Sequence, residues 1–177
     1  MQSVEIKQLI ASNYPDVEVI DINTDNFVFE ERVKHKCFHC KNYNVKWTCP
    51  PRLPAVDYKQ LFGEYEHAVV VYTRSSIENG KISDQIRSQS TNTIHKALLY
   101  LEGEMYKRNN SLALSFIGGS CKLCKNGCNP THCVNPALSR VPWEATGVNI
   151  CKTLKSIGIE VTFPPTDYLY RYGLFLW

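Results

Sequence analysis

A run of four closely spaced cysteines constrains this chain more than any other feature of its sequence. The spacing is Cys-x2-Cys-x3-Cys-x4-Cys, from Cys121 through Cys124 and Cys128 to Cys133. Four thiolates this close can surround one point, as both an iron-sulfur cluster and a tetrahedral zinc ion require. We therefore expect a metal-binding loop over about 118–136.

The composition of this loop favours an iron-sulfur cluster over zinc. Its spacing is similar to the bacterial ferredoxin pattern, but it is one residue longer in the second and third gaps and the proline is displaced. Glycines permit the tight turns that aim backbone N–H groups at sulfide, and the loop has Gly118, Gly119 and Gly127. Cations that offset thiolate charge are also nearby, at Lys122, Lys125 and Arg140. Zinc and a disulfide-stapled loop are the alternatives.

A second cysteine group lies upstream, in a loop of about 35–54. Cys37 and Cys40 form a Cys-x2-Cys pair, and two prolines after Cys49 stiffen the backbone beside its sulfur. Three cysteines do not complete a four-coordinate site, so the fourth position is open or borrowed. The candidates are His35, His39, Asp57, Cys151, a thiolate of the downstream run or an exogenous ligand. Cys151 stands at helical spacing from apolar neighbours, and we expect it to be buried packing.

The composition indicates in which compartment the protein works and which classes of partner it lacks signals for. The 177 residues contain eight cysteines, and the first residues show no basic segment followed by an apolar one, as a secretory signal would. We expect a cytoplasmic protein, in which reduced thiols serve as metal ligands. No apolar stretch is long enough to cross a membrane. A net charge of +3, spread along the chain, gives no indication of nucleic-acid binding. The oligomeric state stays open.

Hydrophobic patterning predicts one domain over 1–177, an α/β or α+β sandwich of a mixed sheet and helices that carries the cysteine loops. The expected helices cover about 4–12, 56–65, 83–108 and a segment from 142 to just before 158. The expected strands cover about 17–22, 26–32, 67–73, 112–117, 159–163 and 167–177. Apolar residues of the longest helix recur every three or four positions and should face the core: Ile94, Leu98, Leu101 and Met105.

The common motifs of metal-independent enzymes are missing from the sequence. It has no phosphate-cradling loop with its lysine, no dinucleotide fingerprint and no Gly-x-Ser-x-Gly nucleophile turn. Glu144 fits the start of a helix, while His67 and His95 fit ordinary helix or strand positions. Whether the chain is an enzyme therefore stays open.

The order of the motifs is itself informative and spans nearly the whole chain. It runs Cys37-x2-Cys40, Trp47-x-Cys49-Pro50-Pro51, Gly119-Ser120-Cys121-x2-Cys124-x3-Cys128-x4-Cys133-x2-Pro136, Glu144-Ala145-x-Gly147 and Gly158-Ile159. In this combination the chain resembles the domain-of-unknown-function 2284 family of predicted metal-binding proteins. The resemblance implies metal binding and, through the family's frequency in anaerobic bacteria and archaea, an iron-sulfur cluster. It implies no reaction, and Cys151 falls outside the pattern.

Two functional hypotheses follow. In the first, Cys121, Cys124, Cys128 and Cys133 hold one [4Fe-4S] cluster, and Cys37, Cys40 and Cys49 contribute to a second. Such a protein would exchange electrons with a redox partner protein or bind a small ligand at the incompletely ligated metal. In the second, zinc stabilises a module that binds a protein partner, with Cys37/Cys40 pairing across the fold with Cys121/Cys124.

Overall fold

The fold is built on one antiparallel sheet of four strands in the order β1-β2-β4-β3, and a computed structural model describes it for residues 1–78 and 80–177. The strands are β1 (Glu18–Ile22), β2 (Ala68–Ser76), β3 (Leu114–Phe116) and β4 (Tyr168–Leu176). The helices are α1 (Ser3–Asn13), α2 (Glu31–Phe38), α3 (Tyr58–Gly63), α4 (Asp84–Lys107) and α5 (Ile150–Ser156), with short 3-10 helices η1 (Thr24–Asn26) and η2 (Trp143–Thr146). This arrangement confirms the α+β expectation, but the four described strands form an antiparallel sheet and not a mixed one.

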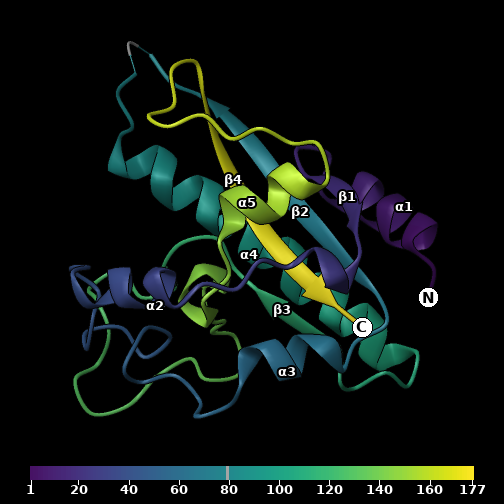
Figure 1. Ribbon diagram of the computed structural model, residues 1–177, viewed down its shortest axis with the longest axis horizontal. Coiled ribbons are helices and arrows are strands. Elements are labelled where there is room, and N and C mark those ends of the chain that lie inside the picture. The colour runs from purple at the N-terminus through teal and green to yellow at the C-terminus, as the bar shows by residue number, and fades with distance from the viewer. Residues whose placement is uncertain (79) are drawn as a thin grey trace.

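Each face of the sheet carries its own core. Val69 and Val71 of β2 pack with residues of α1 and α4, whereas Ala68 and Val70 pack with residues of α3, η2 and α5. Successive side chains of a strand point to opposite faces, so a strand covered on both faces is apolar without alternation. Figure 1 shows α4 behind the sheet and α5 in front of it.

The longest helix, α4, packs closely against β4. Its apolar stripe is fully buried, as the sequence predicts, at Ile94, Leu98, Leu101 and Met105. At the contact, β4 has Gly173, where an added Cβ would lie 2.6 Å from Ile94 Cγ2 and 2.9 Å from Leu98 Cδ1. The missing side chain therefore sets how closely the helix approaches the sheet. Within the described residues, no helix is long and apolar enough to cross a membrane.

Three expectations about secondary structure are wrong. Segment 26–32 is not a strand, because only Phe29 forms an isolated bridge, to Val148, before α2 begins at Glu31. Segment 159–163 is not a strand either. Ile159 and Val161 have no strand partner and instead pack against the core that contains Ala68 and Val70. The helix expected after 142 is divided into η2 and α5, because Gly147 adopts a left-handed conformation (φ 100°) that ends η2.

The close approach of α4 to β4 makes a prediction about stability. Gly173→Ala should lower the free energy of unfolding by about 1–3 kcal/mol, because the new methyl group overpacks the core. Gly103→Ala is the matched control: it lies on the exposed side of α4, its Cβ would meet no described heavy atom within 4 Å, and it should stabilise by about 0.5–1 kcal/mol. Urea unfolding followed by circular dichroism measures both. Equal stability of Gly173→Ala and the wild type would contradict the close packing.

Candidate metal centre and adjoining groove

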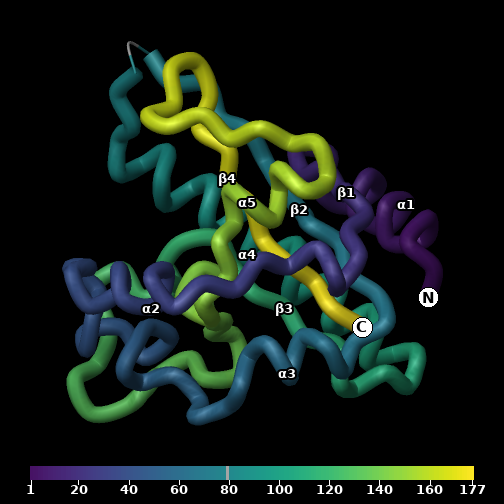
Figure 2. The backbone as a smooth tube through the Cα atoms, viewed as in Figure 1, coloured from purple at the N-terminus to yellow at the C-terminus, as the bar shows by residue number. Residues whose placement is uncertain are grey.

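The two cysteine groups lie at the same end of the molecule. Cys37 is in the last turn of α2, and Cys40 and Cys49 follow in a series of turns that leads to α3. The four-cysteine run lies in an irregular loop between β3 and η2, as the sequence predicts. Figure 2 shows the two loops side by side at the lower left.

Two hydrogen bonds hold these loops together. Lys46 Nζ donates to the backbone oxygen of Cys121 at 3.1 Å, and Trp47 Nε1 donates to the backbone oxygen of Asn129 at 2.8 Å. The guanidinium of Arg52 stacks on the Trp47 ring, 4.2 Å from its centroid, and this cation–π contact also holds the indole in place. We refer to this pair of contacts, made by Lys46 and Trp47, as the loop clamp.

Cys37, Cys40 and Cys49 are within electrostatic reach of one another. Cys49 is only 7% exposed, and its thiol pKa is raised to about 12, chiefly by burial and to a smaller extent by Cys40, Cys37 and Glu144. Burial also raises the pKa of Cys37, again with contributions from Glu144 and Cys40. Without a cation, these thiols suppress one another's ionisation, and a bound metal ion would reverse this effect.

A second set of thiols forms around Cys121. It is 9% exposed, and its pKa is raised by burial and by the neighbouring thiols of Cys128 and Cys124, against the opposing effects of the Leu123 backbone and Lys46. Cys124 Sγ accepts a hydrogen bond from Asn135 Nδ2 at 3.4 Å, a contact typical of the groups that orient sulfur ligands. Cys133 is half-buried in the same loop.

The donor chemistry of these loops fits a metal that prefers sulfur. All eight cysteines are free thiols, and soft thiolates select zinc, copper(I) or iron-sulfur clusters. In the described part of the chain, no three His, Cys, Asp or Glu side chains already stand as a ligand set. Apart from Cys37 in the last turn of α2, the cysteines of both groups lie in segments without regular secondary structure, in which side chains can turn toward a common point.

The candidate fourth ligands of the upstream site differ in their surroundings. Asp57 caps α3 by accepting hydrogen bonds from backbone N–H groups, so that its carboxylate already has a structural role. His35 and His39 are exposed at the end of α2, with ring centroids 5.5 Å apart. Cys151 is exposed on α5, and the expectation of burial is wrong because this helix turns Thr153 and Leu154 to the core instead.

Cationic side chains gather around both loops. Burial lowers the pKa of Lys122, and the nearby charges of Lys46, Lys41 and Arg171 lower it further. Lys46 also depresses the pKa values of Cys49 and Cys121, although burial outweighs its effect at both thiols. This excess of positive charge is suited to a thiolate-bound metal centre with net negative charge.

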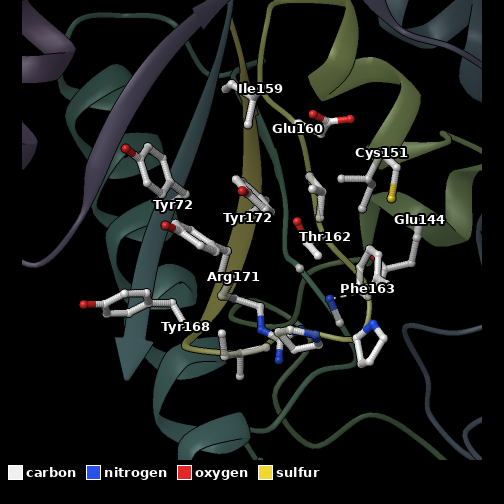
Figure 3. Close-up of a pocket in the computed structure, with 18 of the residues that line it drawn as sticks. Tyr72, Glu144, Cys151, Ile159, Glu160, Thr162, Phe163, Tyr168, Arg171 and Tyr172 are labelled. Carbon is white, nitrogen blue, oxygen red and sulfur yellow. Dashed lines mark hydrogen bonds between the residues drawn. The ribbon is translucent and has the colours of Figure 1, made fainter. Parts of the chain in front are cut away.

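A groove of about 1200 Å³ adjoins the metal loops. Its lining includes Gly118 and Gly119, which lead directly into the four-cysteine run, together with Glu144 and Arg171 (Figure 3). On the other sides are tyrosines of β2 and β4, the segment 159–167 and α5. The groove therefore extends from the sheet to the start of the cysteine loop.

Glu144 and Arg171 are residues that sequence reasoning missed. Glu144 is in the first turn of η2, as predicted, but its side chain turns inward: Oε1 accepts from the Gly119 N–H at 2.9 Å, and Oε2 is buried without a partner among the described residues. Burial raises the pKa of this carboxyl group. Two sequence signals pointed to the pair: Glu144 belongs to the Glu-Ala-x-Gly motif, and Arg171 is a lone cation in an aromatic strand.

Comparison with known proteins gives one match. The model of a family described as "Predicted metal-binding protein (DUF2284)" matches residues 20–177, which is nearly the whole chain and includes every cysteine. No curated protein and no solved structure gives a significant match.

The different exposures of the thiols predict an order of chemical reactivity. In the reduced, metal-free chain, iodoacetamide should modify Cys40 and Cys151 first and Cys49 last, because the first two are exposed and the third is buried with a raised pKa. Mass spectrometry of peptides from a time course measures the order. The chain unfolded in guanidinium chloride is the control, in which the rates should converge. Modification of Cys49 as fast as Cys40 in the folded chain would contradict the assignment.

Proposed function

The chain belongs to the DUF2284 family of predicted metal-binding proteins, and we propose from this premise that its cysteine loops hold one or two [4Fe-4S] clusters. Cys121, Cys124, Cys128 and Cys133 would hold the first. Cys37, Cys40 and Cys49 would contribute to the second, with one position left for another ligand. A bound cluster supplies one-electron redox chemistry.

The observation that carries this proposal is the joining of two thiol sets within a group of lysines. The loop clamp brings the loop of Cys49 against the loop of Cys121. Lys41, Lys46 and Lys122 influence one another there, and no ion pair among the described residues includes them. A cluster held by four thiolates has net negative charge, which these lysines would offset.

Two neighbouring centres are suited to electron transfer, with a redox protein as the partner. The incompletely ligated upstream site also supports the binding of a small ligand at the metal, since an open coordination position is what such chemistry requires. The reducing cytoplasm is the expected location, because there the cysteines stay available as ligands.

The alternative is a zinc-stabilised module that binds a protein partner. The loop clamp supports it, because it brings the Cys37/Cys40 pair and the Cys121/Cys124 pair into adjoining loops, as a zinc ribbon requires. The same pairing leaves Cys49 buried beside a zinc site without a ligand role.

Metal analysis after anaerobic purification distinguishes the two. Iron with matching acid-labile sulfide, and a broad visible absorption that dithionite bleaches, are expected for the cluster protein. Stoichiometric zinc without colour would overturn the iron-sulfur proposal in favour of the zinc module.

Substitution of one cysteine tests the ligand assignment. Cys124→Ser should remove the metal of the downstream centre and lower thermal stability, because the free energy of metal binding contributes to the stability of the native state. Cys151→Ser is the matched control for this centre, since the thiol is exposed on α5 outside the four-cysteine loop, and it should keep the metal of the downstream centre. Metal analysis and thermal unfolding measure both variants. Full metal content in Cys124→Ser would exclude this residue as a ligand.

A further inference from the structure

The groove beside the metal loops has room for a small organic molecule. Its volume of about 1200 Å³ slightly exceeds the roughly 300–1,000 Å³ of typical ligand pockets. Segment 159–167 forms the wall opposite the sheet (Figure 3), and Gly118 and Gly119 are also among the lining residues. These boundaries suit a compact ligand rather than a folded partner.

Two arginines lining this groove have no anionic partner among the described residues. No ion pair of the described chain includes Arg87 of α4 or Arg171 of β4. The Nε atom of Arg171 is buried without a hydrogen-bond partner there. Burial lowers the pKa of Arg171; Glu144 opposes this shift, and Arg87 adds to it. A buried guanidinium beside a second one is unfavourable unless an anion binds between them.

The acidic residues of the groove do not supply this anion. Glu160 and Asp167 are exposed, and Asp167 already accepts a hydrogen bond from the Thr166 hydroxyl. The Glu144 side chain accepts a hydrogen bond from the Gly119 N–H and acts on Arg171 through its charge, but it makes no ion pair with Arg171. One carboxyl group whose own pKa is raised by burial does not neutralise two guanidinium groups, which leaves a place for an anionic ligand.

Aromatic side chains also line the groove. The rings of Tyr170 and Tyr172 stack, with centroids 6.1 Å apart and an interplanar angle of 12°. The ring centroid of Tyr72 lies 5.8 Å from that of Tyr172, its partner in the β2–β4 pairing. On the opposite wall, Phe163 is 73% exposed (Figure 3). The pKa values of Tyr72 and Tyr172 are raised to about 12, chiefly by burial and, at Tyr72, also by the hydrogen bond to Glu18, so their hydroxyls stay neutral. Aromatic faces that remain in contact with water favour a flat apolar ligand.

We propose that this groove binds an aromatic carboxylate, with its carboxylate on Arg171 and Arg87 and its ring between the tyrosines and Phe163. Arginine forks bind planar carboxylates by paired, charge-assisted hydrogen bonds. Together these features select a ligand that has one anionic end and one flat apolar end. This inference goes beyond the metal proposal and does not depend on which metal the loops hold.

Calorimetric titration of the full-length, metal-loaded protein tests it with 2-naphthoate as the probe. The uncharged isostere 2-naphthamide is the ligand control. We expect saturable binding of 2-naphthoate. The amide should bind at least about tenfold more weakly, because it has no negative charge to pair with the arginines. No saturable heat with 2-naphthoate, or equal affinity for the amide, would overturn the proposal.

Variants assign the binding to this groove. Arg171→Gln and Arg87→Gln should each weaken 2-naphthoate binding about tenfold or more. Arg108→Gln, which removes the same charge at the far end of α4, should leave it unchanged. Arg87 is exposed, so its variant keeps the test valid if Arg171→Gln fails to fold. Unchanged affinity in Arg87→Gln would contradict the assignment. Metal content, measured in each sample, separates loss of the ligand from loss of the metal.

Discussion

The pairing of β4 between β2 and β3 is the constraint on which the rest of the structure depends. β4 pairs with β2 over the full length of both strands, whereas β3 pairs only with its last residues, from Leu174 to Leu176. Leu174 belongs to one core and Phe175 to the other, so a single strand organises both faces of the sheet. Because β3 ends at Phe116, the edge of β4 from Tyr168 to Gly173 has no strand beside it on that side in the described chain. The groove covers the sheet at Tyr72 and Tyr172 and reaches this free edge at Gly118, Gly119 and Arg171.

The same edge connects the sheet to the cysteine loop. After β3, the chain passes so close to β4 that a Cβ at Gly118 would lie 1.9 Å from the Tyr172 carbonyl oxygen. Gly119 follows with a positive φ of 77°, and its Cβ would lie 3.1 Å from a terminal nitrogen of Arg171. Only glycine fits both positions without displacing neighbouring atoms. The glycines that the sequence suggested for cluster ligation thus have a packing role as well, which sets where the four-cysteine run begins.

Local patterns in the sequence predicted the elements whose burial has a clear period. The stripe of α4, the apolar β2 and the aromatic β4 follow from the residues themselves, since each has a strong helix or strand signal. Segment 159–163 has the same alternation as a strand but no partner, because pairing depends on contacts distant in the sequence. Local sequence patterns also could not predict the loop clamp or the inward orientation of the Glu144 side chain. Both depend on residues that only the tertiary fold brings together, such as Lys46 with Cys121 and Glu144 with Gly119.

Glu144 lies where the proposed metal centre and the proposed ligand groove adjoin. Its carboxyl group is hydrogen-bonded to Gly119, contributes to the raised pKa values of Cys37 and Cys49, and opposes the lowering of the Arg171 pKa. A change of charge at the upstream thiols therefore acts on the same carboxyl group as an anion at Arg171. Charges at buried sites are weakly screened, so the two sites are coupled through space without any movement of the backbone. Such coupling is reciprocal: whatever free energy a bound metal adds to anion binding, the anion adds to metal binding.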